Sequence, residues 1–210
     1  MFYSTDKPHG LKYNPFKALV VPRPIGWVST LNKAGAINLA PFSFFNAVSD
    51  SPPIVVLGCN GVHIEGGVKD TALNISETGE FVVNIVTWEL REQMNETSAA
   101  VSRDTDEMKL AGLTPAPSRM VKPPRVAASP VSLECVCLQT FDLPSTRGVN
   151  TSFFGKVVGI YISDEIIRDG VIDMSRFHPI ARMGYHDYTV VREVFTMTKP
   201  PGVDPLVPWR

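Results

Sequence analysis

The sequence predicts a mainly β protein, a barrel of strands with a few covering helices. The chain has 210 residues, 18 of them proline, and proline favours turns and strand edges over long helices. Its apolar runs are short, β-branched or aromatic, and bounded by Pro, Gly or Asn, as strands are. These runs do not alternate regularly with helical patterns, which disfavours a parallel α/β fold.

Four apolar segments indicate individual strands. Short runs predict strands over residues 25–30, 54–59 and 81–86. Over residues 131–141 the apolar side chains fall mainly on odd positions, which predicts a strand whose odd side faces the core.

A fifth strand is expected over residues 152–163, which are apolar on both faces. Gly155 and Gly159 within it are candidate bulges or points of close backbone approach. A long strand with two glycines suits a barrel wall that has to bend.

Two helices and one long loop complete the prediction. Asp70 can cap a helix that runs to about Glu77, with Gly79 in the usual stop position after it. A second helix is expected over about 89–101, and the Pro-rich residues 112–130 are expected to form a surface loop. Without a linker or repeat, residues 1–210 are expected to form one domain with a Pro-rich tail at about 198–210.

Composition excludes several classes of function. The net charge of −1 gives no field to hold nucleic acid or an anionic membrane. No apolar run approaches the roughly 20 residues that cross a bilayer, and the N-terminus has no secretory pattern. The three cysteines argue against a disulfide framework, so we expect a reducing, cytoplasmic location.

The segment Lys69-Asp70-Thr71 is the first candidate binding site. It follows Gly66-Gly67 and opens a helix, where free backbone N–H groups and the positive end of the helix dipole attract anions. Lys69 adds a charge and Thr71 a hydroxyl donor, so a cofactor phosphate would fit. An ordinary helix start beside a solvated lysine explains the same residues.

A second candidate lies around Ser43, within residues 38–49. Pro41, Phe42 and the next two phenylalanines form an apolar wall interrupted by polar groups, which suits a planar heteroaromatic ligand. The alternative is that the phenylalanines belong to the core.

Two further segments remain open on sequence alone. Ser29 and Thr30, at the end of a strand, can bond a phosphate or ribityl chain or simply close a turn. Residues 182–188, with Arg182 and two tyrosines, resemble either a lid over a ligand or an edge strand.

No metal site or nucleophilic site is expected. Cys135 and Cys137 are spaced by two, as buried side chains on one strand face are, and lack a zinc spacing. His178 and His186 belong to no spaced pair, and no P-loop, nucleophile elbow or Rossmann fingerprint occurs. A nicotinamide enzyme on this chain would therefore have no Rossmann domain.

Taken in order, these motifs resemble the flavin reductase-like family of FMN-binding split barrels, in particular its flavoredoxin-like branch. The resemblance covers roughly residues 15–190. It rests on residues 23–30, 38–49, 52–53, 69–71, 80–84, 133–135, 155–158 and 182–184.

The resemblance implies a six-stranded antiparallel Greek-key split barrel, a homodimer, and one FMN per subunit near the dimer interface. It places Val28, Ser29 and Thr30 beside the flavin and ribityl chain, Pro41, Phe42 and Ser43 at the isoalloxazine ring, and Lys69, Asp70 and Thr71 at the phosphate. Arg182 and Tyr185 would approach from the C-terminal region, although family members often have paired glycines where this chain has Gly184-Tyr185.

The implied activity is an FMN-dependent oxidoreductase that takes a hydride from NADH or NADPH and passes electrons to a small-molecule acceptor or to a partner oxygenase or redox protein. No catalytic acid or base is assigned. One alternative is an FMN electron carrier that another protein reduces, and a second is a non-enzymatic binding module that has lost the flavin.

Overall fold

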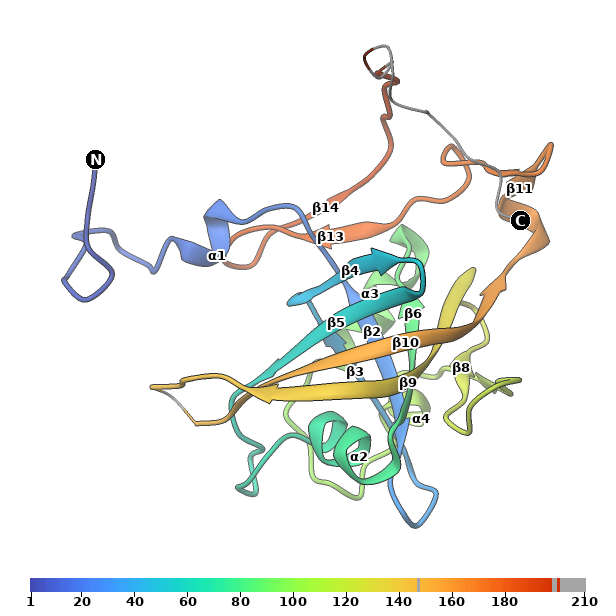
Figure 1. Ribbon diagram of the computed structural model, residues 1–210, viewed down its shortest axis with the longest axis horizontal. Coiled ribbons are helices and arrows are strands. Elements are labelled where there is room, and N and C mark those ends of the chain that lie inside the picture. Colours follow the sequence, from blue (N-terminus) through green and yellow to red (C-terminus); the bar gives the residue numbers. More distant parts are fainter. Residues whose placement is uncertain (147, 198–199, 201–210) are drawn as a thin grey trace.

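The fold is built on a seven-stranded antiparallel sheet. Its strands are β2 (Gly26–Leu31), β3 (Ile37–Phe42), β4 (Phe45–Asp50), β5 (Pro53–Asn60), β6 (Glu80–Ile85), β9 (Val131–Asp142) and β10 (Asn150–Ile162). In the computed structural model, which describes residues 1–146, 148–197 and 200, they pair in the order β3-β2-β6-β9-β10-β5-β4. Since β3 also lies against β5, the sheet curls into a barrel (Figure 1). The mainly β class is confirmed, with seven strands in the sheet where six were expected.

Smaller elements surround the barrel. A three-stranded sheet has the order β1-β13-β14, and two pairs of short strands are β7 with β8 and β11 with β12. Their bounds are β1 (Arg23–Pro24), β7 (Pro115–Ala116), β8 (Arg125–Val126), β11 (Ile167–Arg168), β12 (Val171–Ile172), β13 (Ile180–Arg182) and β14 (Tyr188–Val190). The helical segments are α1 (Phe16–Leu19), α2 (Asp70–Thr78), η1 (Trp88–Leu90), α3 (Arg91–Glu96), α4 (Glu107–Leu110) and η2 (Asp164–Ile166).

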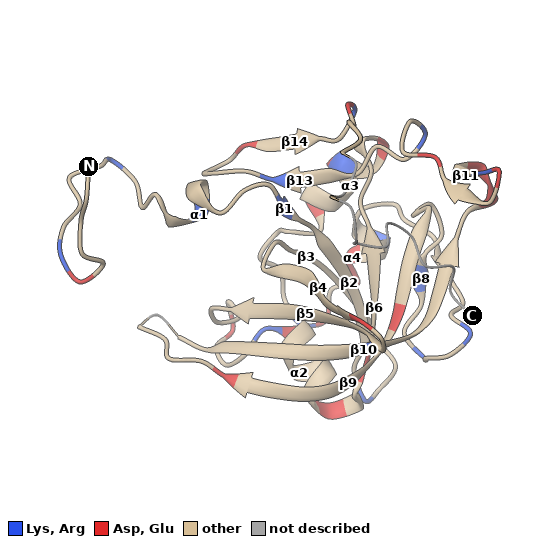
Figure 2. Cartoon of the chain, turned by 45° about the horizontal axis from the view of Figure 1, so that its top comes forward, with Lys and Arg blue, Asp and Glu red and all other residues tan. Residues whose placement is uncertain are grey.

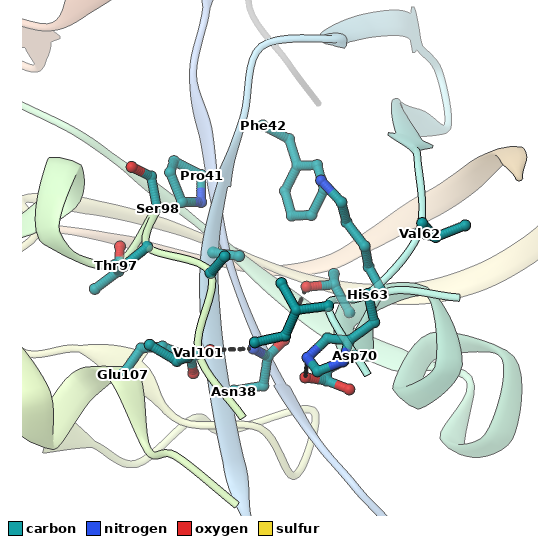
Figure 3. Close-up of a pocket in the computed structure, with 16 residues that line it drawn as sticks. Asn38, Pro41, Phe42, Val62, His63, Asp70, Thr97, Ser98, Val101 and Glu107 are labelled. Atoms are coloured by element: carbon teal, nitrogen blue, oxygen red, sulfur yellow. Dashed lines mark hydrogen bonds and ion pairs between the residues drawn. The ribbon is translucent and has the colours of Figure 1, made fainter. Parts of the chain in front are cut away.

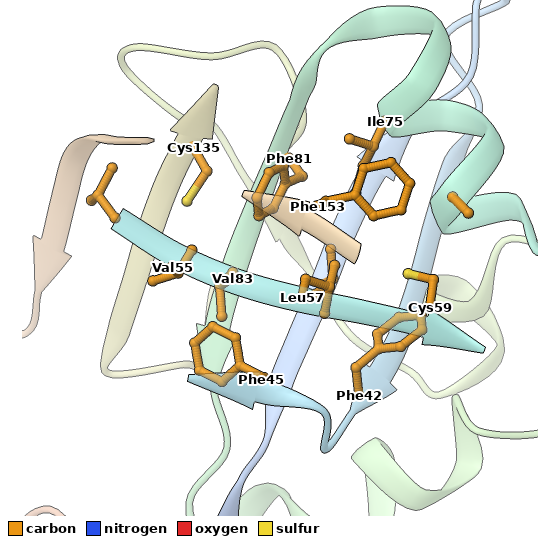
Figure 4. Close-up of a cluster of buried hydrophobic side chains, with 13 residues drawn as sticks. Phe42, Phe45, Val55, Leu57, Cys59, Ile75, Phe81, Val83, Cys135 and Phe153 are labelled. Atoms are coloured by element: carbon orange, nitrogen blue, oxygen red, sulfur yellow. The ribbon is translucent and has the colours of Figure 1, made fainter. Parts of the chain in front are cut away.

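Apolar side chains fill the barrel interior (Figure 4). Phe81 on β6 and Phe153 on β10 are fully buried at its centre. Strand β10 bends past Phe81 through the predicted irregularities, since its register with β9 shifts at Gly155 and again before Gly159. A Cβ at Gly155 would lie 2.3 Å from Phe81 Cζ, so only glycine fits there.

A second apolar cluster lies between the outer face of β2 and β3 and the helices α3 and α4. It includes Trp27, whose Nε1 donates to Thr97 Oγ1 at 2.8 Å. The Thr97 hydroxyl also donates to the Met94 carbonyl at 2.9 Å. The helix expected over 89–101 is therefore shorter, because these bonds hold the chain at Thr97 where α3 ends.

The segment 112–130 is mainly irregular and lies at the surface as expected, but it forms β7 and β8 and is held against the sheet by hydrogen bonds. Ser29 Oγ donates to the Pro124 carbonyl at 2.6 Å, and the Val126 N–H donates to Asn84 Oδ1 at 2.8 Å. The carboxylate of Glu134 accepts the backbone N–H groups of residues 119 and 120. The segment thus packs over the sheet and buries Glu134, an even position of β9 that the alternating pattern had placed outside.

The N-terminal segment leads away from the barrel (Figure 1). It exposes several large apolar side chains, namely Phe2, Leu11, Tyr13, Phe16 and Leu19. Lys and Arg positions and Asp and Glu positions are both distributed along the described chain (Figure 2). Within the described residues, no helix is long and apolar enough to cross a membrane. The predicted tail at 198–210 lies outside the described residues except for Pro200.

Candidate functional site

A cleft of about 240 Å³ opens beside the start of α2 (Figure 3). One wall is the end of β3, the second is the loop that leads from β5 into α2, and the third is the segment after α3. The lining residues are Asn38, Ala40–Phe42, Val62–Ile64, Lys69–Thr71, Thr97–Val101 and Glu107. Of the predicted site residues, the cleft therefore brings together Pro41, Phe42, Lys69, Asp70 and Thr71.

The start of α2 gives the cleft its positive end. Lys69 occupies the cap position in extended conformation, and its carbonyl accepts the first helical hydrogen bond, from the Leu73 N–H. The N–H groups of the first turn have no helical carbonyl to bond, and they face the N-terminal side of the helix. Asp70 is thus the first helical residue, one position later than the cap predicted from the sequence.

The carboxylate of Asp70 is held by two cationic or donating side chains. Arg103 Nη1 forms an ion pair with Asp70 Oδ1. His63 Nδ1 accepts the Glu65 N–H at 3.1 Å, and His63 Nε2 lies 3.3 Å from Asp70 Oδ2 (Figure 3). These contacts offset the charge of Asp70, which would otherwise repel an anion at this helix end.

Arg103 also fixes the loop before α2. Its Nη2 donates to the carbonyls of Gly66 and Val68 at 2.8 Å and 2.9 Å. One guanidinium therefore joins the third wall of the cleft to the second. Sequence reasoning missed Arg103 and His63 because neither lies in a recognisable motif with Asp70.

The opposite side of the cleft is a buried polar chain. Glu107 accepts the Leu39 N–H at 3.0 Å and the Asn38 amide at 2.9 Å. Asn38 Oδ1 in turn accepts the Thr71 hydroxyl at 2.8 Å. Burial raises the pKa of Glu107, while the Leu39 N–H and the Asn38 amide act in the opposite direction. Because the Thr71 hydroxyl already donates to Asn38, Thr71 offers a ligand its backbone N–H and not the hydroxyl donor expected from the sequence.

Pro41 and Phe42 form the apolar wall. Pro41 is half-buried, whereas Phe42 is 8% exposed and also belongs to the barrel core. Phe42 thus belongs to the core and also lines the cleft, and its contact with a planar ligand stays a prediction. Ser43 lies outside the cleft lining, and its hydroxyl accepts from Arg23 Nε at 3.4 Å.

Strand β2 contributes no side chain to the cleft. Val28, Ser29 and Thr30 are fully buried. Val28 packs in the barrel core, Ser29 holds the Pro124 carbonyl, and Thr30 Oγ1 bonds the buried side chains of Asn38 and Asn74. Their predicted contact with a flavin stays a prediction, since within one chain these side chains are occupied elsewhere.

Arg182 and Tyr185 also lie outside the cleft lining. Arg182 Nη2 donates to the Tyr185 carbonyl, and its Nη1 to the Tyr188 hydroxyl, which closes the turn between β13 and β14. Tyr185 has a φ of 55° and packs its ring on that of Tyr13 at 5.5 Å between centroids. Residues 182–188 thus form the end of the middle strand β13, a turn and the start of the edge strand β14, and their contact with a ligand stays a prediction.

Thiol and metal chemistry find no support in the described part of the chain. Burial raises the pKa of Cys59 to about 12 and also raises that of Cys135 and Cys137, so these thiols stay protonated at neutral pH. No group of three His, Cys, Asp or Glu side chains among the described residues is arranged to hold a metal ion.

Comparisons with known proteins define the family. The family model of the flavin reductase like domain matches residues 18–181. An uncharacterized protein of Aquifex aeolicus is 38% identical over 173 residues, which are 82% of this chain and 86% of that protein.

Two solved structures share the whole fold. Nitrilotriacetate monooxygenase component B from Bacillus cereus superposes with a TM-score of 0.84 at 29% identity, covering 94% of this chain and 98% of that one. The 2-nitrobenzoate 2-nitroreductase of Pseudomonas fluorescens gives a TM-score of 0.82 at 27% identity, covering 97% and 98%. The motifs, the barrel and these matches agree, and the chain belongs to the family of proteins with a flavin reductase like domain.

Proposed function

We propose that this protein is an FMN-binding oxidoreductase that NADH or NADPH reduces, and that the cleft beside α2 holds the phosphate end of the cofactor. The observation that carries the proposal is the pairing of a helix N-terminus and Lys69 with an apolar wall in one cleft. A flavin mononucleotide has the matching parts, a dianionic phosphate and a planar ring system.

The charges in the cleft fit a phosphate. Lys69 is exposed, and among the described residues no carboxylate lies within ion-pair distance of its ammonium group. Asp70, the nearest residue in sequence, is already bound by Arg103 and His63. Lys69 and the first-turn N–H groups are therefore available to an anion, each N–H adding a charge-assisted hydrogen bond.

The size of the cleft supports a dimer. Its volume of about 240 Å³ is below the roughly 300–1,000 Å³ of pockets that enclose a drug-sized ligand. One chain would thus enclose only part of an FMN, and a second subunit would cover the rest. The exposed apolar side chains of the N-terminal segment, such as Tyr13 and Phe16, are available for such a homodimer. Sedimentation equilibrium of the full chain tests it, since a monomer at micromolar concentration would refute the dimer.

The residues of the chain position the cofactor and shield it from water, and we assign none of them as an acid or base. When bound, FMN supplies the redox chemistry, accepting a hydride equivalent from a reduced nicotinamide and releasing electrons to an acceptor. Pro41 and Phe42 exclude water from one face of the cleft, and Lys69 holds the negative end. A partner oxygenase is a suitable acceptor, in view of the similarity to a monooxygenase component. The three free thiols support a reducing, cytoplasmic compartment.

An absorption spectrum from 300 to 550 nm, recorded before and after anaerobic NADH and then NADPH, tests the proposal. We expect flavin bands that disappear on addition of one nicotinamide. Bands that persist would favour an electron carrier reduced by another protein. No flavin bands in the protein fraction after incubation with FMN and removal of unbound FMN by desalting would refute the cofactor assignment.

The variant Lys69→Met tests the placement of the phosphate. A charged hydrogen bond contributes about 1.5–3 kcal/mol, so the Kd for FMN should rise about 10- to 150-fold. The matched control is Lys33→Met, because Lys33 pairs with Glu77 at the other end of the same helix at 3.1 Å. Equal effects of the two variants would place the phosphate elsewhere.

A further inference from the structure

A second and larger cavity lies beside β8 and the end of β10, apart from the cleft. It measures about 660 Å³ and shares no lining residue with the cleft beside α2. Its walls are the end of β10, the segment 117–120, β8 and η2. The lining residues are Pro117–Met120, Arg125, Glu134, Val158–Ile162 and Asp164.

Arg125 presents an unused donor here. Its guanidinium carbon lies 3.7 Å from the centroid of the Tyr161 ring, which fixes the plane of the group. The Arg125 Nη1 atom is buried and has no hydrogen-bond partner among the described residues. No other nitrogen of this guanidinium donates a hydrogen bond within the described chain either, so the part that lines the cavity is available to an acceptor.

The nearby carboxylate of Glu134 does not fill this role. Glu134 is 4% exposed, and its oxygens accept the backbone N–H groups of Arg119 and Met120 at 2.6–3.0 Å. No carboxylate of the described chain lies within ion-pair distance of Arg125. The Glu134 carboxylate is therefore occupied by backbone donors, and the Arg125 guanidinium has no carboxylate partner in the described chain.

The remaining surface is mostly carbon, and it is kept open by a glycine. A Cβ at Gly159 would lie 2.9 Å from Met120 Cγ and 3.4 Å from Glu134 Oε2. Val158, Ile160 and Met120 supply apolar walls around the site. The volume lies within the range of small-molecule pockets.

We propose that this cavity is an accessory binding site for a small monocarboxylate with an apolar body, whose carboxylate accepts from the part of the Arg125 guanidinium that lines the cavity. Two arginines and two carboxylates line the cavity, namely Arg119, Arg125, Glu134 and Asp164, so their formal charges cancel. A single negative charge is therefore tolerated better than the two charges of a phosphate ester. The site does not depend on FMN and is separate from the proposed redox cleft.

Benzoate is the probe, titrated into the full-length protein by calorimetry and by thermal unfolding. We expect one saturable site per chain and a melting temperature that rises with benzoate concentration. Acetate, without the apolar body, and inorganic phosphate, with a second charge, should both bind at least about tenfold more weakly. Equal binding of all three anions would overturn the assignment to a monocarboxylate.

Variants locate the site. Arg125→Met should weaken benzoate binding by about 10- to 100-fold, whereas Arg168→Met, at an exposed arginine outside the cavity, should leave it unchanged. Arg125→Lys keeps the charge without the planar fork and should fall between them. Lys69→Met separates this site from the cleft, since benzoate affinity should not change when FMN affinity falls.

The proposal fails if the wild-type protein shows no saturable binding, or if Arg125→Met binds benzoate as tightly as the wild type. A variant Arg125→Met that is more stable than the wild type, together with no benzoate binding to either, would show that water alone serves the buried donor. A wild-type protein that does not bind FMN would refute the proposed function and would leave the benzoate test unaffected.

Discussion

Removal of the Glu107 carboxylate should both weaken the fold and change its dependence on pH. In Glu107→Ala, the Leu39 N–H and the Asn38 amide lose their acceptor, and both residues are buried. Two unsatisfied buried donors at about 1–3 kcal/mol each would lower the free energy of unfolding by about 2–6 kcal/mol. Glu107→Gln keeps the volume and one carbonyl oxygen but turns an amide N–H₂ toward a donor, so about half of that loss is expected.

The pH dependence separates the charge of Glu107 from its hydrogen bonds. Burial raises the pKa of Glu107 in the native state above its ordinary value of 4.5, so over that interval the native state binds more protons than the unfolded state. Stability then falls as pH rises through the interval. The wild type should therefore lose stability relative to Glu107→Gln from below pH 4.5 upward, until the native carboxyl is fully ionised.

Urea unfolding measured between pH 4 and 8 at one protein concentration provides the assay, with the fluorescence of buried Trp27 as signal. The difference between the wild type and Glu107→Gln is the quantity to follow, because other titrating groups cancel in it. If the free energy of unfolding of the wild type instead rises relative to that of Glu107→Gln as pH increases, the direction of the pKa shift is refuted. A loss below about 0.5 kcal/mol in Glu107→Ala would refute the hydrogen-bond argument.

Three further changes test the core and the cleft. Gly155→Ala would press a methyl group to 2.3 Å from Phe81 Cζ and should cost about 1–3 kcal/mol in chemical unfolding. Gly159→Ala would bring its methyl group to 2.9 Å from Cγ of the exposed Met120, which can move, and to ordinary contact distance from Glu134, so it should cost less; equal costs would contradict the packing argument. Arg103→Met frees the loop before α2 and leaves Asp70 charged, so the Kd for FMN should rise about tenfold in a fluorescence titration, with Arg192→Met as an unaffected control. Ser29→Ala should reduce stability by about 1–3 kcal/mol through the lost bond to Pro124 and leave FMN affinity unchanged. A direct contact between Ser29 and the cofactor would instead lower FMN affinity and leave stability unchanged.

Local patterns predicted the strands and the first helix well. The runs over 25–30, 54–59 and 81–86 correspond to β2, β5 and β6, and the helix after Lys69 ends before Gly79 as expected. These features depend on side-chain periodicity, turn residues and helix stops, all of which are local in sequence.

The features that sequence did not predict depend on partners far along the chain. The Pro-rich segment 112–130 is held over the sheet because Ser29 and Asn84, both far from it in sequence, and Glu134, which follows it on β9, bond its backbone. The cleft similarly needs Arg103 beside Asp70, a contact across 33 positions. Composition describes such a segment as a loop, because the acceptors and donors that fix it appear only in the folded chain.

Strand β4 closes one end of the main sheet, and its outer edge has a consequence for association. It pairs only with β5 among the described strands, so half of its backbone donors and acceptors are available to any extended peptide. The register shift between Ala47 and Ser49 kinks this edge, and Asn46 and Asp50 place polar side chains along it. An incoming strand would find a ladder interrupted after a few bonds, which disfavours sheet-to-sheet growth and amyloid-like stacking. Straightening the edge by deletion of Val48 would remove that protection and should promote aggregation before it affects the cleft.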